Sequence, residues 1–152
     1  MLNITTPTYA KTYTTEYPVI IVPTGYPQSP DAFDTTAVDI LRYFQNKQFD
    51  IKIHSSPETF ATFELNSNLK RLGKFAVKEV ALPTFLSIMA NFIYEHYTSV
   101  PSVDSEPVNL TVCIEVCDSN DMKVNKRIDF EGCAEQFDEM ASNISDLLNN
   151  GN

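Results

Sequence analysis

The pattern of apolar and polar residues is clearest in the last third of the chain, over residues 108–148. Apolar residues alternate with polar ones along 108–116, and the alternation returns along 122–130 after the polar stretch 118–121. A period of two is typical of strands that bury one face, and a short polar stretch between two such runs indicates a β-hairpin. The sequence therefore predicts a C-terminal hairpin.

The register of this hairpin follows from its apolar residues. If Val116 faces Met122, then Leu110 faces Ile128, and one side of the hairpin is apolar throughout. Beyond the hairpin, apolar residues recur at the three- and four-residue spacing of a helix, and we expect this helix to pack on the apolar side. Its apolar residues are Phe137, Met140, Ala141, Ile144, Leu147 and Leu148.

Upstream, the pattern predicts shorter elements. The run 19–22 is apolar and β-branched between two prolines, which indicates a short buried strand. Thr35 or Thr36 precedes apolar residues at helical spacing and is suited to cap a helix that ends near residue 47. The segments 51–53 and 60–65 are strand-like and predict a second hairpin.

The segment 68–80 fits two structures. Its apolar stripe favours a helix, although Gly73 and β-branched neighbours also allow a strand. On a helix, four basic residues would share one side, namely Lys70, Arg71, Lys74 and Lys78. Pro83 then either begins a new helix at its first turn or kinks a longer one, and a wide apolar helical face follows it.

Together these elements predict an α+β fold with a mostly antiparallel sheet, including the C-terminal hairpin, covered by three to four helices. The length of 152 residues fits a single domain, which we place at residues 18–152. Residues 1–17, which are rich in Thr and Tyr from residue 5, are expected to form an extended arm, with an edge strand or a mobile tail as alternatives.

The charge balance limits the partners. Eleven basic and twenty acidic residues give a formal net charge of -9, which disfavours nucleic acids and anionic membranes as partners. The acidity is uneven, because six carboxylates and no Lys or Arg occur from Asp129 onward. The absence of a signal-like or membrane-spanning stretch and the odd count of three cysteines lead us to expect a cytoplasmic protein.

The residues give little sign of catalysis. Four glycines are too few for a phosphate-binding glycine loop. Cys113 and Cys117 would lie about 13 Å apart on one strand, too far for a shared zinc ion. We therefore expect no metal and no cofactor. The rival interpretation is an enzyme that uses Cys133 with His54 or His96.

The sequence thus favours a small acidic, non-enzymatic module that binds another protein through charge complementarity, as an accessory, regulatory or immunity-type subunit. Two surfaces are candidates. The acidic C-terminal helix offers Asp138 and Glu139, and the basic segment offers Lys70, Arg71, Lys74 and Lys78. Self-assembly into a homo-oligomer, through the Thr/Tyr segment or a hairpin edge, is a further alternative.

Overall fold

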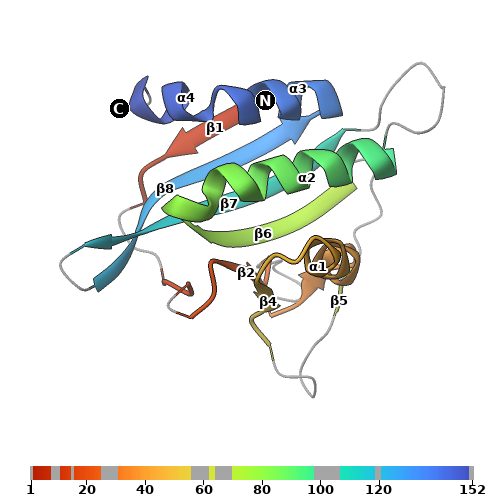
Figure 1. Cartoon of the computed structure of the whole chain (residues 1–152), viewed down its shortest axis with the longest axis horizontal. Helices are drawn as coiled ribbons and strands as arrows, with labels where there is room; N and C mark the ends of the chain where they lie inside the picture. The colour runs from red at the N-terminus through yellow and green to blue at the C-terminus, as the bar shows by residue number, and fades with distance from the viewer. Residues whose placement is uncertain are drawn as a thin grey trace.

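The computed structural model describes residues 2–7, 11–14, 16–24, 31–55, 62–63, 70–97, 107–118 and 121–150. These residues form a six-stranded sheet in the order β1-β8-β7-β6-β2-β4 and a two-stranded sheet of β3 and β5 (Figure 1). The strands are β1 (Leu2–Thr5), β2 (Val19–Val22), β3 (Phe33–Asp34), β4 (Ile51–Ile53), β5 (Thr62–Phe63), β6 (Lys70–Lys78), β7 (Val108–Asp118) and β8 (Asp121–Gly132). The helices are α1 (Ala37–Asn46), the 3-10 turn η1 (Glu79–Ala81), α2 (Leu82–Tyr97), α3 (Ala134–Ser142) and α4 (Ile144–Asn150).

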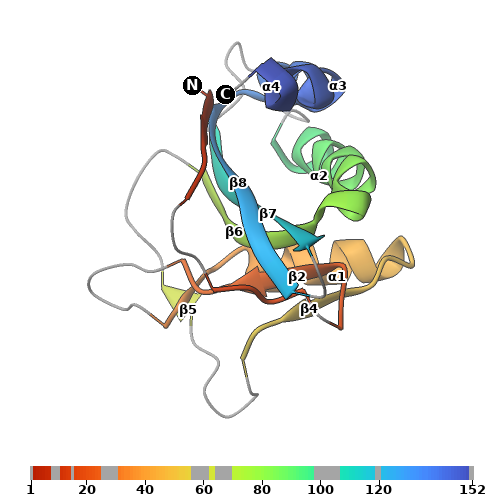
Figure 2. The ribbon, with the colours of Figure 1, turned by 90° about the vertical axis from the view of Figure 1, so that its left-hand side faces the viewer.

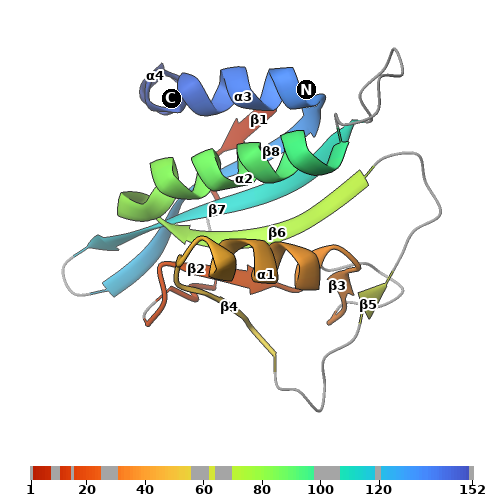
Figure 3. The same ribbon diagram turned by 45° about the vertical axis from the view of Figure 1, so that its right-hand side comes forward.

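The α+β class is confirmed, but the large sheet is mixed rather than mostly antiparallel. Strands β6 and β7 run parallel, as do β2 and β4, while β1–β8, β7–β8 and β2–β6 are antiparallel pairs. Parallel neighbours need a crossover connection. Helix α2 lies between β6 and β7 in the chain, and α1 lies between β2 and β4, so each serves as the crossover (Figure 3).

The described helices all cover one face of the large sheet (Figure 2). The main core lies between them and the sheet. Phe85 of α2 packs on Phe44 of α1 and on Phe75 of β6, with ring centroids 5.5 and 5.3 Å apart. Phe137 of α3 meets Phe130 of β8 edge to face at 5.2 Å. Aromatic pairs thus join each of these helices to the sheet or to its neighbour.

Several upstream predictions are confirmed. All four residues of β2 are buried, and Pro83 lies in the first turn of α2. Thr36 precedes α1, but its hydroxyl caps no amide of that helix. Instead, Thr36 Oγ1 donates hydrogen bonds to the carbonyls of Arg71 and Leu72 at 2.8 and 3.3 Å. The start of α1 is thereby tied to β6.

The predicted second hairpin is wrong, because β4 pairs in parallel with β2, and β5 pairs in parallel with β3. The helix predicted over 68–80 is also wrong, since Lys70–Lys78 is strand β6, between β2 and β7. A central strand is buried on both faces, so its apolar residues do not alternate with polar ones. Their spacing can then resemble the apolar stripe of a helix. The basic residues therefore do not share the side of a helix.

Strands β7 and β8 are antiparallel neighbours, but their register differs from the predicted one. Val116 pairs with Lys123 rather than Met122, and Leu110 pairs with Phe130 rather than Ile128. The register shifts at Ile114/Glu115, where the pairing on β8 passes over Asn125. A shift of one residue would reverse the faces of a strand. Because β8 has one extra residue at this bulge, Ile128 pairs with Val112 and Phe130 pairs with Leu110. These apolar residues of β7 and β8 therefore lie on the same side of the sheet.

The final predicted helix is interrupted at Asn143, which separates α3 from α4. Asn143 closes α3, with its side-chain amide donating to the carbonyl of Glu139 at 2.9 Å. Phe137, Met140 and Ile144 are buried, so the apolar stripe continues across the break. Its predicted packing on the sheet is confirmed by the contact between Phe137 and Phe130.

Gly73 permits the bulge in β6. Its φ is +119°, which residues with a side chain rarely adopt, and the pairing with β7 is irregular between Arg71 and Gly73.

We expect Gly73→Ala to lower the free energy of unfolding by about 1–3 kcal/mol, because alanine is strained at this φ. Urea unfolding measures the change. Val80→Ala, at an exposed side chain, is the control, and an equal effect of both variants would contradict this assignment.

Candidate functional site

The side of the large sheet opposite the helices is termed here the open face (Figure 2). Along it, neighbouring strands bring polar and charged residues into rows. Lys74 of β6 pairs with Thr111 of β7, and Thr111 pairs with Asp129 of β8. Paired residues point to the same side of a sheet. The open face is therefore the place where the basic strand β6 meets the polar residues of the C-terminal strands.

The described residues of 13–17, termed here the covering segment, lie over part of this face and are held there by Glu115 of β7. Glu115 is 1% exposed, and its carboxylate accepts hydrogen bonds from the main-chain amides of Tyr13 and Thr14 at 2.9–3.0 Å. The Thr14 hydroxyl donates a further bond at 2.7 Å. A buried carboxylate needs such donors. Glu115 therefore fixes the main chain at residues 13–14 against the sheet.

The tyrosines of this segment form a second, smaller core. Tyr13 and Tyr17 pack against Ile20 and Val22 of β2 and against Ala76 of β6. Tyr13 lines two adjoining hollows, and Tyr17 lines one of them.

The first, termed the cationic hollow, has a volume of about 180 Å³. Three of its lining residues are basic. Lys11 lies two residues before Tyr13 in the chain, Lys74 belongs to β6, and Arg127 belongs to β8. The other lining residues are Pro7, Tyr13, Val22, Ala76 and Cys113. Among the residues that the structure describes, no carboxylate lines it, although the chain carries a net charge of -9.

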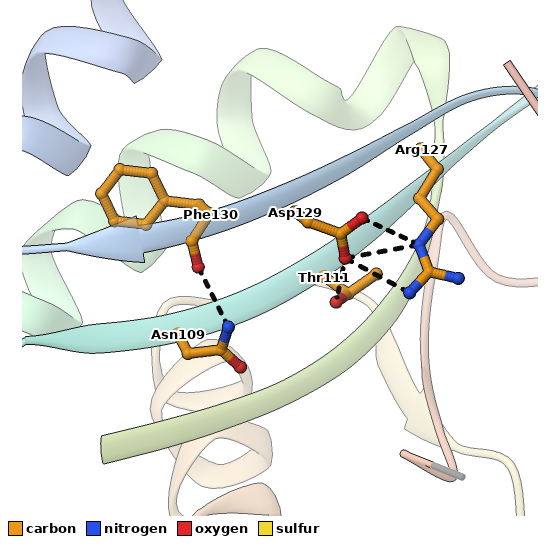
Figure 4. Close-up of polar contacts among 5 residues, drawn as sticks. All are labelled: Asn109, Thr111, Arg127, Asp129 and Phe130. Carbon is orange, nitrogen blue, oxygen red and sulfur yellow. Dashed lines mark hydrogen bonds and ion pairs between the residues drawn. The ribbon is translucent and has the colours of Figure 1, made fainter. Parts of the chain in front are cut away.

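Arg127 is oriented by its strand neighbour Asp129. Its Nε lies 3.0 Å from Asp129 Oδ2, and Nη2 donates to Oδ1 at 3.3 Å. Thr111 Oγ1 donates to the same Oδ1 at 2.7 Å (Figure 4). In Figure 4 the other terminal nitrogen of Arg127 points away from Asp129. The ion pair therefore positions the guanidinium and leaves one of its edges directed elsewhere.

Cys113 contributes a thiol to the cationic hollow. Burial raises the pKa of this thiol, and the negative charges of Asp129 and Glu115 act in the same direction. Lys74 and Arg127 lower the pKa but do not outweigh the burial. The protonated thiol is therefore favoured, which makes Cys113 a poor nucleophile at neutral pH.

The second, larger hollow adjoins the first, shares Lys11 and Tyr13 with it, and has a volume of about 570 Å³. It is termed the tyrosine hollow. Lys52 lies over the Tyr17 ring at 5.3 Å, and His54 meets the Tyr13 ring edge to face at 4.7 Å. Its remaining lining residues are Thr12, Glu16, Ile20, Ile53 and Ser55.

A third hollow is lined by residues of the edge strand β1, of β8 and of helices α3 and α4. Figure 1 shows α3 and α4 beside β1 at that edge of the sheet. This hollow is termed the C-terminal hollow and has a volume of about 480 Å³. Its apolar residues are Leu2, Phe130, Met140 and Leu147, and its polar residues are Gln136, Glu139, Asn143 and Asp146. Both carboxylates are exposed, so they form an acidic rim over an apolar floor.

The structure separates the predicted site residues. Lys74 lines the cationic hollow, whereas Lys78 pairs with Glu115 further along β6. Lys70 and Arg71 lie at the beginning of β6 and line neither hollow of the open face. Glu139 and Asp146 line the C-terminal hollow. Asp138, which precedes Glu139 in the chain, does not line it.

Sequence analysis missed Lys11 and Arg127. Both are isolated from the basic segment along the chain. Sheet pairing brings Arg127 of β8 toward Lys74 of β6, and Lys11 lies just before the residues that Glu115 binds. One signal for Arg127 was present, because residues 126 and 127 interrupt the alternation of β8 with two consecutive basic residues.

The cysteine and histidines of the alternative enzyme hypothesis contact different residues. Cys133 is the N-cap of α3 and shares a capping box with Gln136. His54 contacts Tyr13, while His96 stacks on Phe92 at 4.1 Å, and neither contact involves Cys133. Across the described part of the chain, no group of three His, Cys, Asp or Glu residues is arranged to hold a metal ion.

Comparison of the chain with protein-family models, with curated proteins and with solved structures gives no match. Function must therefore be inferred from its own residues. Of the helices that the structure describes, none has the length and apolar character needed to cross a membrane.

The role of Glu115 is tested by removing its charge. We expect Glu115→Gln to lower the free energy of unfolding by about 2–3 kcal/mol, because the amide cannot accept all the bonds from Tyr13 and Thr14. Urea unfolding measures the change, with Glu79→Gln at an exposed position as the control. Equal stability of the two variants would show that Glu115 does not hold this segment.

Proposed function

We propose that this chain is a non-enzymatic protein-interaction module that binds a basic amphipathic helix of a partner protein in the C-terminal hollow. The observation that supports it is the combination of an apolar floor and an acidic rim in one hollow of about 480 Å³. An amphipathic helix docks in such a groove by inserting apolar side chains.

The apolar floor supplies the binding free energy. Phe130 and Met140 are buried beneath the hollow, while Leu2 and Leu147 are partly exposed. Burial of one large aliphatic or aromatic side chain contributes about 1.5–3 kcal/mol. Two or three such side chains on one face of a partner helix would give a specific interaction, after the cost of association is subtracted.

The acidic rim selects the partner. Glu139 and Asp146 border the hollow, and the chain has no Lys or Arg after Arg127 that would neutralise them from nearby in sequence. Complementary charges raise the association rate and reject partners of like charge. A second copy of this chain, docked symmetrically, would bring its own acidic rim to the contact and be repelled. The favoured occupant is therefore another protein.

A cytoplasmic location belongs to the same proposal. Cys113, Cys117 and Cys133 form no disulfide, which suits a reducing compartment.

Two charge reversals on α3 test the site. A fluorescent amphipathic helix made of Leu and Lys serves as the probe, and anisotropy measures its affinity. Glu139→Lys is expected to weaken binding about tenfold, because it reverses a charge on the rim. Asp138→Lys changes the net charge equally but lies outside the hollow, so we expect an effect of about twofold or less.

Equal weakening by the two variants would assign the binding to net charge alone and contradict the proposed site. Binding unaffected by Glu139→Lys would also contradict it. Met140→Ala, which removes part of the apolar floor, separates apolar docking from electrostatic attraction. The proposed site requires weaker binding for this variant at moderate salt, where charge effects are screened.

A further inference from the structure

The cationic hollow lies in a different part of the molecule from the C-terminal hollow, and the two share none of their described lining residues. Three separate segments deliver Lys11, Lys74 and Arg127 to it. Like charges that share a partly enclosed space repel one another. This arrangement is stabilised when an anion occupies the space. We propose that the cationic hollow binds a small phosphate-bearing ligand.

The two neighbouring carboxylates already have hydrogen-bond donors, and Asp129 offsets only the charge of Arg127. Asp129 is engaged by Arg127 and Thr111, and Glu115 is engaged by main-chain amides of the covering segment. The Lys11 ammonium lies over the Tyr13 ring at 5.3 Å, and among the described residues neither it nor Lys74 is paired with a carboxylate. Both ammonium groups can contact a ligand, together with the edge of the Arg127 guanidinium that points away from Asp129 (Figure 4).

The chemistry of these groups suits phosphate. Lysine offers a compact charge with three donors, and arginine offers a planar set of donors that matches phosphate oxygens. Charge-assisted hydrogen bonds of this kind are about twice as strong as neutral ones. Tyr13 and Val22 are apolar or aromatic lining residues of the same hollow, and an anion beside them is less screened than one in bulk water.

The size of the hollow indicates a small ligand. Its volume of about 180 Å³ accommodates a phosphate group but lies below the ~300 Å³ at which pockets for drug-sized molecules begin. The adjoining tyrosine hollow, at about 570 Å³, offers room for the rest of a phosphate ester beside Tyr13 and Tyr17. A nucleic acid strand is disfavoured, because the net charge of -9 repels a long polyanion.

Cys113 provides a reporter inside the hollow, because its thiol lies among the proposed ligand contacts. In a Cys117→Ser, Cys133→Ser background, Cys113 is the chain's one remaining cysteine. Serine is a good N-cap residue, so it suits the first turn of α3. The rate of Cys113 modification by a thiol reagent is then measured with inorganic phosphate and with chloride at equal ionic strength.

Phosphate is expected to slow Cys113 modification at millimolar concentration, and chloride is not. Lys74→Met keeps the length of the side chain and removes one charge, so it should weaken the protection about tenfold or more. Each rate is compared with that of the same variant without phosphate, since Lys74 also affects the thiol itself. Lys47→Met, at an exposed residue beside Tyr43 of α1, is the control and should keep the protection.

The inference is overturned if phosphate and chloride slow the reaction equally, or if Lys74→Met keeps full protection. Calorimetric titration of the unmodified chain with inorganic phosphate gives an independent measurement. Absence of binding heat together with absence of protection would also overturn it. Neither measurement depends on the C-terminal hollow, so its result leaves the proposed protein interaction unaffected.

Discussion

The buried carboxylate of Glu115 is the interaction on which the open face depends. All the described helices cover the opposite side of the sheet, so this side must be covered by other means. The main chain at Tyr13 and Thr14 is bound to Glu115, and the tyrosines of that segment then shield Ile20, Val22 and Ala76. Both hollows of the open face have Lys11 and Tyr13 in their walls, so both exist only while this segment is held.

The mixed sheet separates the two surfaces at which binding is proposed. The α2 crossover places β6 beside β7 in parallel, which brings Lys74 next to the strand that carries Cys113 and Glu115. The antiparallel pairs β7–β8 and β1–β8 extend the sheet in the other direction, toward α3 and α4. The cationic hollow and the C-terminal hollow therefore lie at different places, and the proposed anion and the proposed basic helix would not compete for one site.

Local elements could be predicted from the sequence where one pattern dominates. Strand β2 is uniformly apolar, and α1 and α2 have apolar residues at helical spacing, although the sequence left two alternatives for the start of each helix. The segment 70–78 was assigned wrongly because a central strand buries both faces and carries no alternation. Strand direction, the bulge at Asn125 and the convergence of Lys11, Lys74 and Arg127 depend on pairings between distant residues, which a local pattern does not contain.

Hydrogen–deuterium exchange at the amides of Tyr13 and Thr14 tests the central claim most directly. If the Glu115 carboxylate binds both amides, they exchange as slowly as the amides of the adjoining strand β2, and they open only when the sheet opens. Exchange at the rate of an unprotected chain would contradict this account, because the open face would then be uncovered and neither of its hollows would be formed.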